Sequence, residues 1–295
     1  MQSFTIRDME NLTGIKAHTL RIWEQRYPLF QPKRKESRHR IYDNEDLKKL
    51  LRISFLYHGG WKISRIASLS EEQILSAVDN VDINGSVSHL VNQLLESAID
   101  FNEAQFGGLL HEYIRQIGFE RCITEVCYPF LQKIGLLWTT NKVIPGQEHF
   151  SSYLIQNKII VETEKLELSS KPPQLLLFCP KGEFHELPLL FINYLLKKNG
   201  RSTIYLGINM HKNDLLAFRS IESVQFVYLH LITNFTGLFA DDYLEDICRN
   251  FSDKIILASG EGIRQVQRNF VNLRLLKNDR QIYEFIQNPE AFLKS

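Results

Sequence analysis

Residues 4–24 read FTIRDMENLTGIKAHTLRIWE, and this stretch decides the fold at the start of the chain. Apolar residues recur over residues 6–12 at the spacing of one helical face. Gly14 then supplies an unhindered backbone for a turn, and residues 17–25 form a second helix. The stretch therefore predicts a helix-turn-helix, with the second helix as the candidate recognition helix.

The segment after this helix is rich in positive charge. Residues 30–42 are polar and interrupted by proline, which fits a short two-stranded wing better than a helix. A helix capped by Asp43 or Asn44 follows, and the unit closes near Ser76. The wing carries five basic residues against the single acid Glu36, namely Lys33, Arg34, Lys35, Arg38 and Arg40. A net charge of +1 for the whole chain thus conceals a local basic surface suited to nucleic acid.

Together these segments closely resemble the MerR family of transcription regulators. The resemblance is carried by Phe4-Thr5-Ile6, Thr13-Gly14-Ile15, Thr19-Leu20-Arg21-Ile22-Trp23-Glu24, Arg38-His39-Arg40-Ile41-Tyr42 and Asp46-Leu47. It implies that residues 1–76 form a winged helix-turn-helix domain that binds double-stranded operator DNA. By position it gives phosphate contacts to Arg21, Arg38, Arg40 and Tyr42. Ser37 stands where many relatives have glycine, which would alter the turn into the wing.

Nine residues are candidate DNA contacts: His18, Thr19, Arg21, Trp23, Arg26, Tyr27, Arg38, Arg40 and Tyr42. Arginine binds guanine or phosphate through two hydrogen bonds, and hydroxyl and aromatic groups fix the DNA backbone. On the residues alone, an alternative holds for three of them. Arg21 and Arg26 would be solvated helix charges, and Trp23 would belong to the core.

Two regions of different periodicity follow. Residues 83–168 have helical spacing and predict a four-helix bundle, with breaks at Gly107-Gly108, Gly118, Pro129 and Pro145-Gly146. A polar linker over 169–173 marks a domain boundary. Residues 174–295 alternate helices with five apolar runs, at 174–179, 202–206, 226–232, 254–258 and 271–275. The chain is therefore predicted to be multidomain and to end in an α/β domain, a doubly wound, flavodoxin-like parallel sheet of five strands that binds ligands beyond the carboxyl ends of its strands.

The predicted bundle contains Trp138 and, after nine residues, Glu148-His149. This spacing resembles the motif with which light-sensing cobalamin regulators cover the adenosyl face of adenosylcobalamin. An indole can stack over the adenosyl group, and a carboxylate and an imidazole can hydrogen-bond its ribose or approach the cobalt. The alternative is that Trp138 packs in the bundle and Glu148-His149 merely starts a helix.

The loop after the first predicted strand of the α/β domain contains Glu183 and His185. It resembles the Asp-x-His-x-x-Gly loop of base-off cobalamin proteins, in which histidine is the lower cobalt ligand and the acid orients its other nitrogen. By this resemblance His185 is the metal ligand. Pro188 departs from the glycine of that motif. His230 stands where a small serine is usual beside the slot for the nucleotide tail, and residues 259–262 only partly match the usual Gly-Gly turn.

Three functions are compatible with these features. The first is a DNA-binding repressor or activator gated by adenosylcobalamin and by light. The second is the same regulator with a degenerate sensor that no longer binds cobalamin. The third, a cobalamin-dependent methyltransferase or mutase module, is disfavoured because such enzymes use a separate substrate barrel of roughly 250 residues. No phosphate loop, Ser-His-Asp order or HExxH motif is present, so we expect no catalysis.

The composition of the chain is that of an ordinary globular protein. Hydrophobic residues make up 44% and charged residues 23% of the chain, as in globular proteins. No apolar window approaches the roughly 20 residues of a membrane span, and no secretory signal opens the chain, so we expect a cytoplasmic protein without a membrane partner. The four scattered cysteines suit core thiols. A homo-oligomer is expected, with contacts from the sensor half, because no long coiled coil follows the wing.

Overall fold

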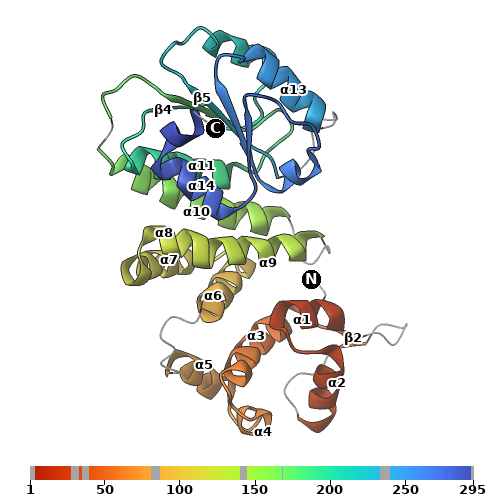
Figure 1. Ribbon diagram of the computed structural model, residues 1–295. Helices are drawn as coiled ribbons and strands as arrows, with labels where there is room; N and C mark the ends of the chain where they lie inside the picture. The colour runs from red at the N-terminus through yellow and green to blue at the C-terminus, as the bar shows by residue number, and fades with distance from the viewer. Residues whose placement is uncertain are drawn as a thin grey trace. The chain divides into compact units, whose positions relative to one another are not determined.

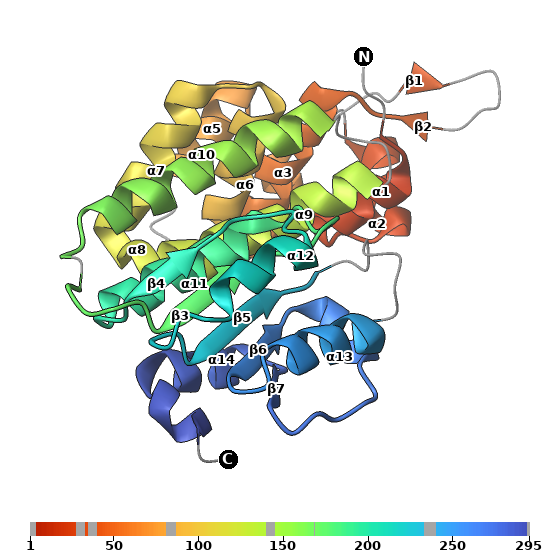
Figure 2. The same cartoon turned by 90° about the horizontal axis from the view of Figure 1, so that it is seen from above.

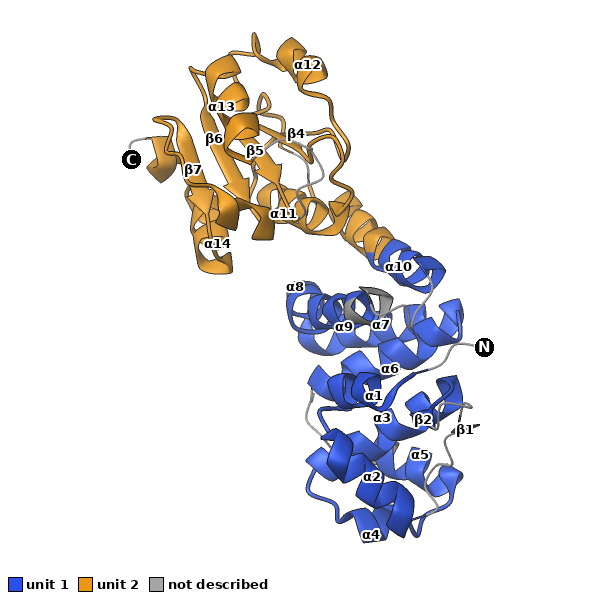
Figure 3. Cartoon of the chain, turned by 90° about the vertical axis from the view of Figure 1, so that its right-hand side faces the viewer, with its two compact units in different colours: residues 1–155 blue, residues 156–295 orange. Residues whose placement is uncertain are grey.

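The computed structural model describes residues 4–27, 33–34, 40–80, 87–139, 145–167, 169–232 and 240–293. The chain divides into two compact units, residues 1–155 and 156–295, which Figure 3 colours separately. The three domain ranges proposed from the sequence, 1–76, 83–168 and 174–295, stay predictions. None of the helices that the structure describes is long and apolar enough to cross a membrane.

The N-terminal region is a winged helix-turn-helix, as predicted. Its helices are α1 (Ile6–Thr13), α2 (Ala17–Arg26), α3 (Asn44–His58), α4 (Ile63–Ile66) and α5 (Glu71–Asn80), and its two strands are β1 (Lys33–Arg34) and β2 (Arg40–Ile41). Thr5 caps α1 and Asp43 caps α3, each in a reciprocal capping box that satisfies the first amides of the helix. Gly14 ends α1 in the left-handed region, with φ of 72°, where glycine is favoured. The antiparallel pair β1–β2 forms the base of the wing; β2 is labelled in Figure 1 and both strands are labelled in Figure 2.

The core of this region comes from the apolar faces of α1, α2 and α3. Met9, Leu20 and Leu47 are almost fully buried. Phe4 is buried as well, and its backbone pairs with that of Tyr42 through N–H to O distances of 2.8 and 3.0 Å. The wing base is therefore fixed to the start of the chain.

Four helical stretches follow. They are α6 (Val87–Ile99), α7 (Glu103–Ile117), a stretch built from α8 (Phe119–Arg121), the π-helical turn η1 (Cys122–Cys127) and α9 (Tyr128–Thr139), and finally α10 (Pro145–Glu164). The breaks predicted at Gly118 and Pro145 are confirmed. The break at Gly107-Gly108 is wrong, because Phe106 and Leu110 bury one face of α7 and offset the cost of about 1 kcal/mol per glycine. The break predicted at Pro129 is also wrong, because the chain passes from η1 into α9 without interruption and the wider π-helical turn ends just before the proline.

The second unit is built on a five-stranded parallel sheet. The strands are β3 (Leu175–Phe178), β4 (Thr203–Tyr205), β5 (Phe226–His230), β6 (Ile255–Ser259) and β7 (Leu273–Leu276), in the order β4-β3-β5-β6-β7. All neighbouring pairs are parallel. This is the flavodoxin-like order, so the predicted fold class is confirmed, with shifts of a few residues at the strand ends.

Helices cover both faces of the sheet (Figure 2). The connecting helices are α11 (Glu186–Lys198), α12 (Lys212–Leu215), η2 (Leu216–Phe218), α13 (Ala240–Asn250), η3 (Glu261–Gln265), α14 (Asp279–Gln287) and η4 (Pro289–Leu293). Alternate residues of β5 face opposite sides. Val227 and Leu229 pack in the cluster that includes α13, whereas Tyr228 packs against Phe285 of α14. The chain order reverses between β3 and β5, which places the loop after β3 at the topological switch point.

Candidate functional site

Helix α2 presents several of the predicted DNA contacts to solvent. His18, Arg21 and Arg26 are exposed, and Thr19 and Tyr27 are half-buried. The hydrophobic face of the helix, with Leu20 at its centre, points into the core. This leaves the polar face of α2 accessible, as a recognition helix requires.

Trp23 lies on the other face of α2. Only 4% of it is exposed, and its ring meets Tyr57 of α3 edge to face at a centroid distance of 4.9 Å. An indole in this position holds α2 against α3 and cannot reach a DNA groove without leaving the core. The burial favours the core alternative for Trp23 over a direct DNA contact.

Glu24 holds the wing base to the recognition helix. Its Oε2 accepts a hydrogen bond from Arg40 Nε at 2.5 Å, and its Oε1 accepts one from the Tyr42 hydroxyl. Tyr42 is fully buried, and burial followed by the neighbouring Glu24 raises the pKa of its hydroxyl well above the usual value. Tyr42 is thus placed to position the wing. Arg38 lies outside the described residues.

Glu24 was quoted in the motif of the recognition helix but was given no role. Its position one residue after a core tryptophan signals a side chain near the core boundary, yet its two partners are 16 and 18 residues away in sequence. Only the folded wing brings them together.

The predicted contacts to the adenosyl face lie in the helical region of the first unit. Trp138 belongs to α9, and its side chain lies outside the described residues. Glu148 is in the first turn of α10, where its Oε1 accepts a hydrogen bond from Ser152 Oγ at 2.6 Å. His149 is 68% exposed, with Nδ1 3.4 Å from Glu148. Both side chains are therefore accessible at the start of one helix.

The loop at the switch point holds the predicted metal ligand. The Glu183 side chain is 1% exposed, and its Oε1 lies 2.6 Å from His185 Nδ1 and accepts the His185 backbone N–H at 3.0 Å. Its Oε2 accepts the N–H of Ile232, beyond the end of β5, at 2.8 Å. The carboxylate fixes the Nδ1–H tautomer, so the lone pair of the neutral ring is on Nε2. Because 45% of the His185 side chain is exposed, this nitrogen belongs to an accessible imidazole.

Three buried side chains fill the space at the ends of β5 and β6. His230 Nδ1 lies 2.8 Å from Ser259 Oγ, and the Tyr228 hydroxyl donates to the same oxygen at 2.7 Å. Burial lowers the pKa of His230 to about 4, so the ring is neutral at pH 7. The strands approach closely here, since a Cβ added to Gly260 would lie 2.2 Å from the Leu231 carbonyl oxygen.

Comparison with known proteins agrees with this architecture. Residues 4–73 match the MerR HTH family regulatory protein model, and residues 90–161 match the B12 binding domain model. The chain combines a MerR-type DNA-binding region with a B12-binding domain. The MerR-type match covers the helices and wing described above, and the B12-binding match runs from within α6 to near the end of α10.

Several transcription regulators are similar in sequence to this chain. Over 221 residues it is 22% identical to the HTH-type transcriptional repressor CarH of Myxococcus xanthus, covering 72% of this chain and 74% of CarH. It is 25% identical to the repressor CarA of the same organism, covering 68% and 67%. It is 23% identical to the transcriptional regulator MlrA of Salmonella typhimurium, covering 73% of each chain. All three relatives are transcription regulators by name, in agreement with the expectation from the sequence.

A solved corrinoid protein has the same fold. The monomethylamine corrinoid protein of Methanosarcina barkeri superposes with a TM-score of 0.55 at 13% identity, over 69% of this chain and all of that protein. The likeness shows a shared fold.

The donor set suits the metal end of a corrinoid. Among the described residues no group of three or more His, Cys, Asp or Glu side chains could hold a metal ion. One accessible imidazole with a buried carboxylate behind it is the arrangement a single axial ligand needs. At the strand ends, by contrast, His230 occupies the position that the resemblance reserves for a small residue beside the nucleotide tail. Pro188 lies in the first turn of α11, which proline tolerates.

Proposed function

We propose that the protein is a DNA-binding transcription regulator that holds cobalamin through His185. The observation that carries the proposal is the buried Glu183 carboxylate, which engages His185 Nδ1 with one oxygen and Ile232 N–H with the other. Burying a carboxylate is energetically costly unless its charge is compensated by hydrogen bonds. Orienting an imidazole that binds a metal is a role that accounts for this burial. The MerR-type and B12-binding matches agree with both halves of the proposal.

On the DNA side, we infer that the exposed face of α2 and the wing contact an operator duplex. Arg21 and Arg26 are the exposed cations of α2, and Arg40 is held at the wing base by Glu24. Arginines at these positions supply charge for phosphates, with Arg21 nearest the start of the helix, where base contacts are made. Binding of one such unit is weak, so a homo-oligomer that joins several units would raise operator occupancy.

The finer form of the sensor is also a proposal. By resemblance, Trp138, Glu148 and His149 contact the adenosyl group of adenosylcobalamin. When bound, this cofactor supplies a cobalt–carbon bond that light cleaves. The residues of the chain would supply the response, because Glu148 and His149 sit at the start of α10, whose first turns pack on the rest of the helical region.

A direct experiment tests cofactor retention. The full chain is saturated with adenosylcobalamin in the dark, passed over a gel-filtration column, and assayed for cobalt per chain. We expect about one cobalt per wild-type chain and strongly reduced retention for His185→Ala, with the exposed His211→Ala as a matched control that retains the cofactor. A colourless wild-type fraction would overturn the cobalamin proposal and leave DNA binding untouched.

One observation favours a second candidate, a regulator whose sensor has lost cobalamin. The hydrogen-bonded set of Tyr228, His230 and Ser259 is complete without a ligand, and it fills the strand ends where the nucleotide tail is expected. The same column distinguishes the candidates. If wild type elutes without cobalt and His230→Ser elutes with it, the slot is closed in the natural chain and the second candidate holds.

A further inference from the structure

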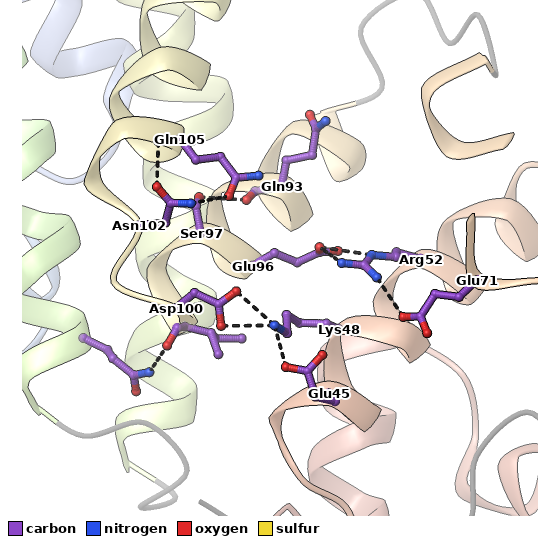
Figure 4. A network of polar contacts seen from close by, with 12 residues as sticks. Glu45, Lys48, Arg52, Glu71, Gln93, Glu96, Ser97, Asp100, Asn102 and Gln105 are labelled. Carbon is purple, nitrogen blue, oxygen red and sulfur yellow. Dashed lines mark hydrogen bonds and ion pairs between the residues drawn. The ribbon is translucent and has the colours of Figure 1, made fainter. Parts of the chain in front are cut away.

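Two ion pairs join the DNA-binding region to the helical region within the first unit (Figure 4). Lys48 Nζ lies 2.9 and 3.1 Å from the two carboxylate oxygens of Asp100. Arg52 donates to Glu96 Oε2 from Nη2 at 2.7 Å and from Nε at 3.1 Å. Lys48 and Arg52 are four residues apart on α3. Glu96 lies on the last turn of α6, and Asp100 directly follows that helix, so the two pairs lie side by side between α3 and the end of α6.

Three of the four side chains in these ion pairs are largely buried. Lys48, Arg52 and Glu96 are 10%, 15% and 16% exposed, whereas Asp100 is 47% exposed. Burial raises the pKa of Glu96, although Arg52 opposes the shift. For Lys48, burial alone would lower the pKa, but the bonds to Glu45 and Asp100 outweigh it and raise the pKa. Separating Arg52 from Glu96 would leave a buried carboxylate without this cation, whereas Lys48 would keep Glu45 at 2.7 Å.

A third contact reaches the same place from α10. Gln147 is 2% exposed, and its Nε2 donates to the carbonyl oxygen of Ile99 at 2.7 Å. Ile99 ends α6, where carbonyl groups have no partner within their own helix. Ile99 directly precedes Asp100, the partner of Lys48, and Gln147 directly precedes Glu148 and His149. One buried hydrogen bond thus links the segment predicted to contact the cofactor to the residue next to the Lys48–Asp100 ion pair.

Aromatic packing supports this link. Phe150 follows His149, and its ring centroid lies 5.4 Å from that of Phe101 and 6.3 Å from that of Phe106. Phe101 adopts a positive φ of 52° in the tight turn between α6 and α7. Residues 147–150 are therefore held to the end of α6 by the hydrogen bond, to the turn after α6 by the Phe101 ring, and to α7 by the Phe106 ring.

The basic partners of the two ion pairs lie on α3, and both ends of this helix are connected to the DNA-binding surface. Helix α3 begins immediately after the wing, and Tyr42 at this junction bonds to Glu24 of the recognition helix. Near the end of α3, His58 Nε2 lies 2.9 Å from the Thr13 carbonyl oxygen, beside the turn that precedes α2. A displacement of α3 is thus felt at both the wing and the recognition helix.

We propose that Gln147, Asp100 and Lys48 form a relay that couples the Glu148–His149 segment to the DNA-binding helices. A change at the start of α10 shifts the Ile99 carbonyl, the adjacent Asp100 carries the shift to Lys48, and α3 transmits it to the wing and α2. The coupling is a property of the chain itself. It rests on the proposed function only for the identity of the ligand that drives it.

Hydrogen exchange measured by mass spectrometry on the full chain tests the relay without any ligand. Gln147→Leu strands a buried carbonyl group, and Asp100→Asn keeps the side-chain shape but removes the charge. We expect both to accelerate exchange of the α3 amides, residues 44–58, by about three- to tenfold, the effect of one net hydrogen bond. The matched control is Gln156→Leu on the same helix, whose partner is Glu186 and not α6, and it should leave α3 unchanged.

Acceleration confined to α10 and the end of α6 in Gln147→Leu would overturn the relay. If that variant does not fold, Asp100→Asn decides alone through the reciprocal effect, since coupling between two sites must act in both directions. It should then accelerate exchange over residues 145–152, and an unchanged rate there would contradict the relay.

A second arm separates the relay from the identity of its ligand. Adenosylcobalamin added in the dark should slow exchange in α3 of the wild type and not in Asp100→Asn. If the wild-type chain binds no cobalamin, the proposed function fails while the effects of the substitutions still decide the relay.

Discussion

Glu24 in the DNA-binding region and Glu183 in the α/β domain both hold a functional side chain in place, although they lie in unrelated folds. Each is a buried carboxylate with one oxygen on a functional side chain, Arg40 or His185, and the other on the framework, the Tyr42 hydroxyl or the Ile232 amide. They differ in the charge of the functional partner. Arg40 is always charged and compensates Glu24, whereas His185 is a titratable ring suited to hold a metal.

In both places the carboxylate fixes the position of the functional side chain, whereas the charge of that side chain depends on whether it is an arginine or a histidine. At the wing, the carboxylate places a cation for phosphate. At the switch point, it fixes a tautomer and so selects which nitrogen faces outward. Removing each carboxylate should therefore harm different properties, stability at Glu24 and ligand affinity at Glu183.

The largest expected effect belongs to Glu24→Ala. It leaves Arg40 and the buried Tyr42 hydroxyl without their shared acceptor, and we expect a loss of about 3 kcal/mol in the free energy of unfolding of the N-terminal region. Urea unfolding followed by circular dichroism measures it. The exposed Glu72→Ala serves as the control and should stay near wild type. Equal midpoints for the two variants would show that Glu24 does not fasten the wing.

His230 is a second histidine near Glu183, but it is buried and is not the predicted metal ligand. Its folded pKa of about 4 is below the ordinary 6.5, so the unfolded chain binds the extra proton first as the pH falls. The stabilisation is complete above about pH 6.5 and is lost towards pH 4, up to about 3 kcal/mol. His230→Asn should flatten this dependence in unfolding experiments between pH 4 and 7, and His211→Asn should not. Parallel curves for wild type and His230→Asn would contradict the assignment.

Substitution of Glu183 by glutamine tests whether this carboxylate orients His185 for cobalamin. The amide removes the charge behind the imidazole and can present N–H where the structure needs an acceptor, so we expect cobalamin affinity to fall about 10- to 100-fold. Spectroscopic titration in the dark measures the dissociation constant. Glu222→Gln, on an exposed part of the same unit, is the control. Wild-type affinity in Glu183→Gln would mean that the carboxylate does not orient a ligand.

The smallest effect is expected at the DNA surface. Arg21→Ala removes one exposed cation, so it should reduce the slope of log affinity against log salt by about one and weaken binding modestly. Fluorescence anisotropy with a labelled duplex at several salt concentrations gives the slope. Arg115→Ala, exposed on α7, provides the comparison. A slope unchanged by Arg21→Ala would remove this residue from the interface.

Much of this arrangement could be predicted from the sequence because its signals are local. The helix-turn-helix rests on Gly14 and on helical periodicity, and the α/β domain rests on short apolar runs between helices. The pairing of Glu183 with His185 spans two residues and follows a motif. These features need no knowledge of distant parts of the chain.

What the sequence could not supply depends on long-range contacts. Glu24 meets Tyr42 only because the wing folds back on α2, and Tyr42 is consequently buried rather than displayed to DNA. The bond of Ile232 to Glu183 spans 49 residues across the switch point. The helix through Gly107-Gly108 persists because tertiary burial of Phe106 and Leu110 outweighs local propensity.

The central claim, that His185 is a cobalt ligand, is tested most directly by electron paramagnetic resonance of the cob(II)alamin complex of uniformly ¹⁵N-labelled protein. A protein imidazole on cobalt splits each cobalt line into two, whereas the ¹⁴N benzimidazole of the cofactor splits each line into three. We expect doublets in the wild type that disappear in His185→Ala. Triplets in the labelled wild-type protein, or doublets that persist in His185→Ala, would contradict the assignment of His185 as the cobalt ligand.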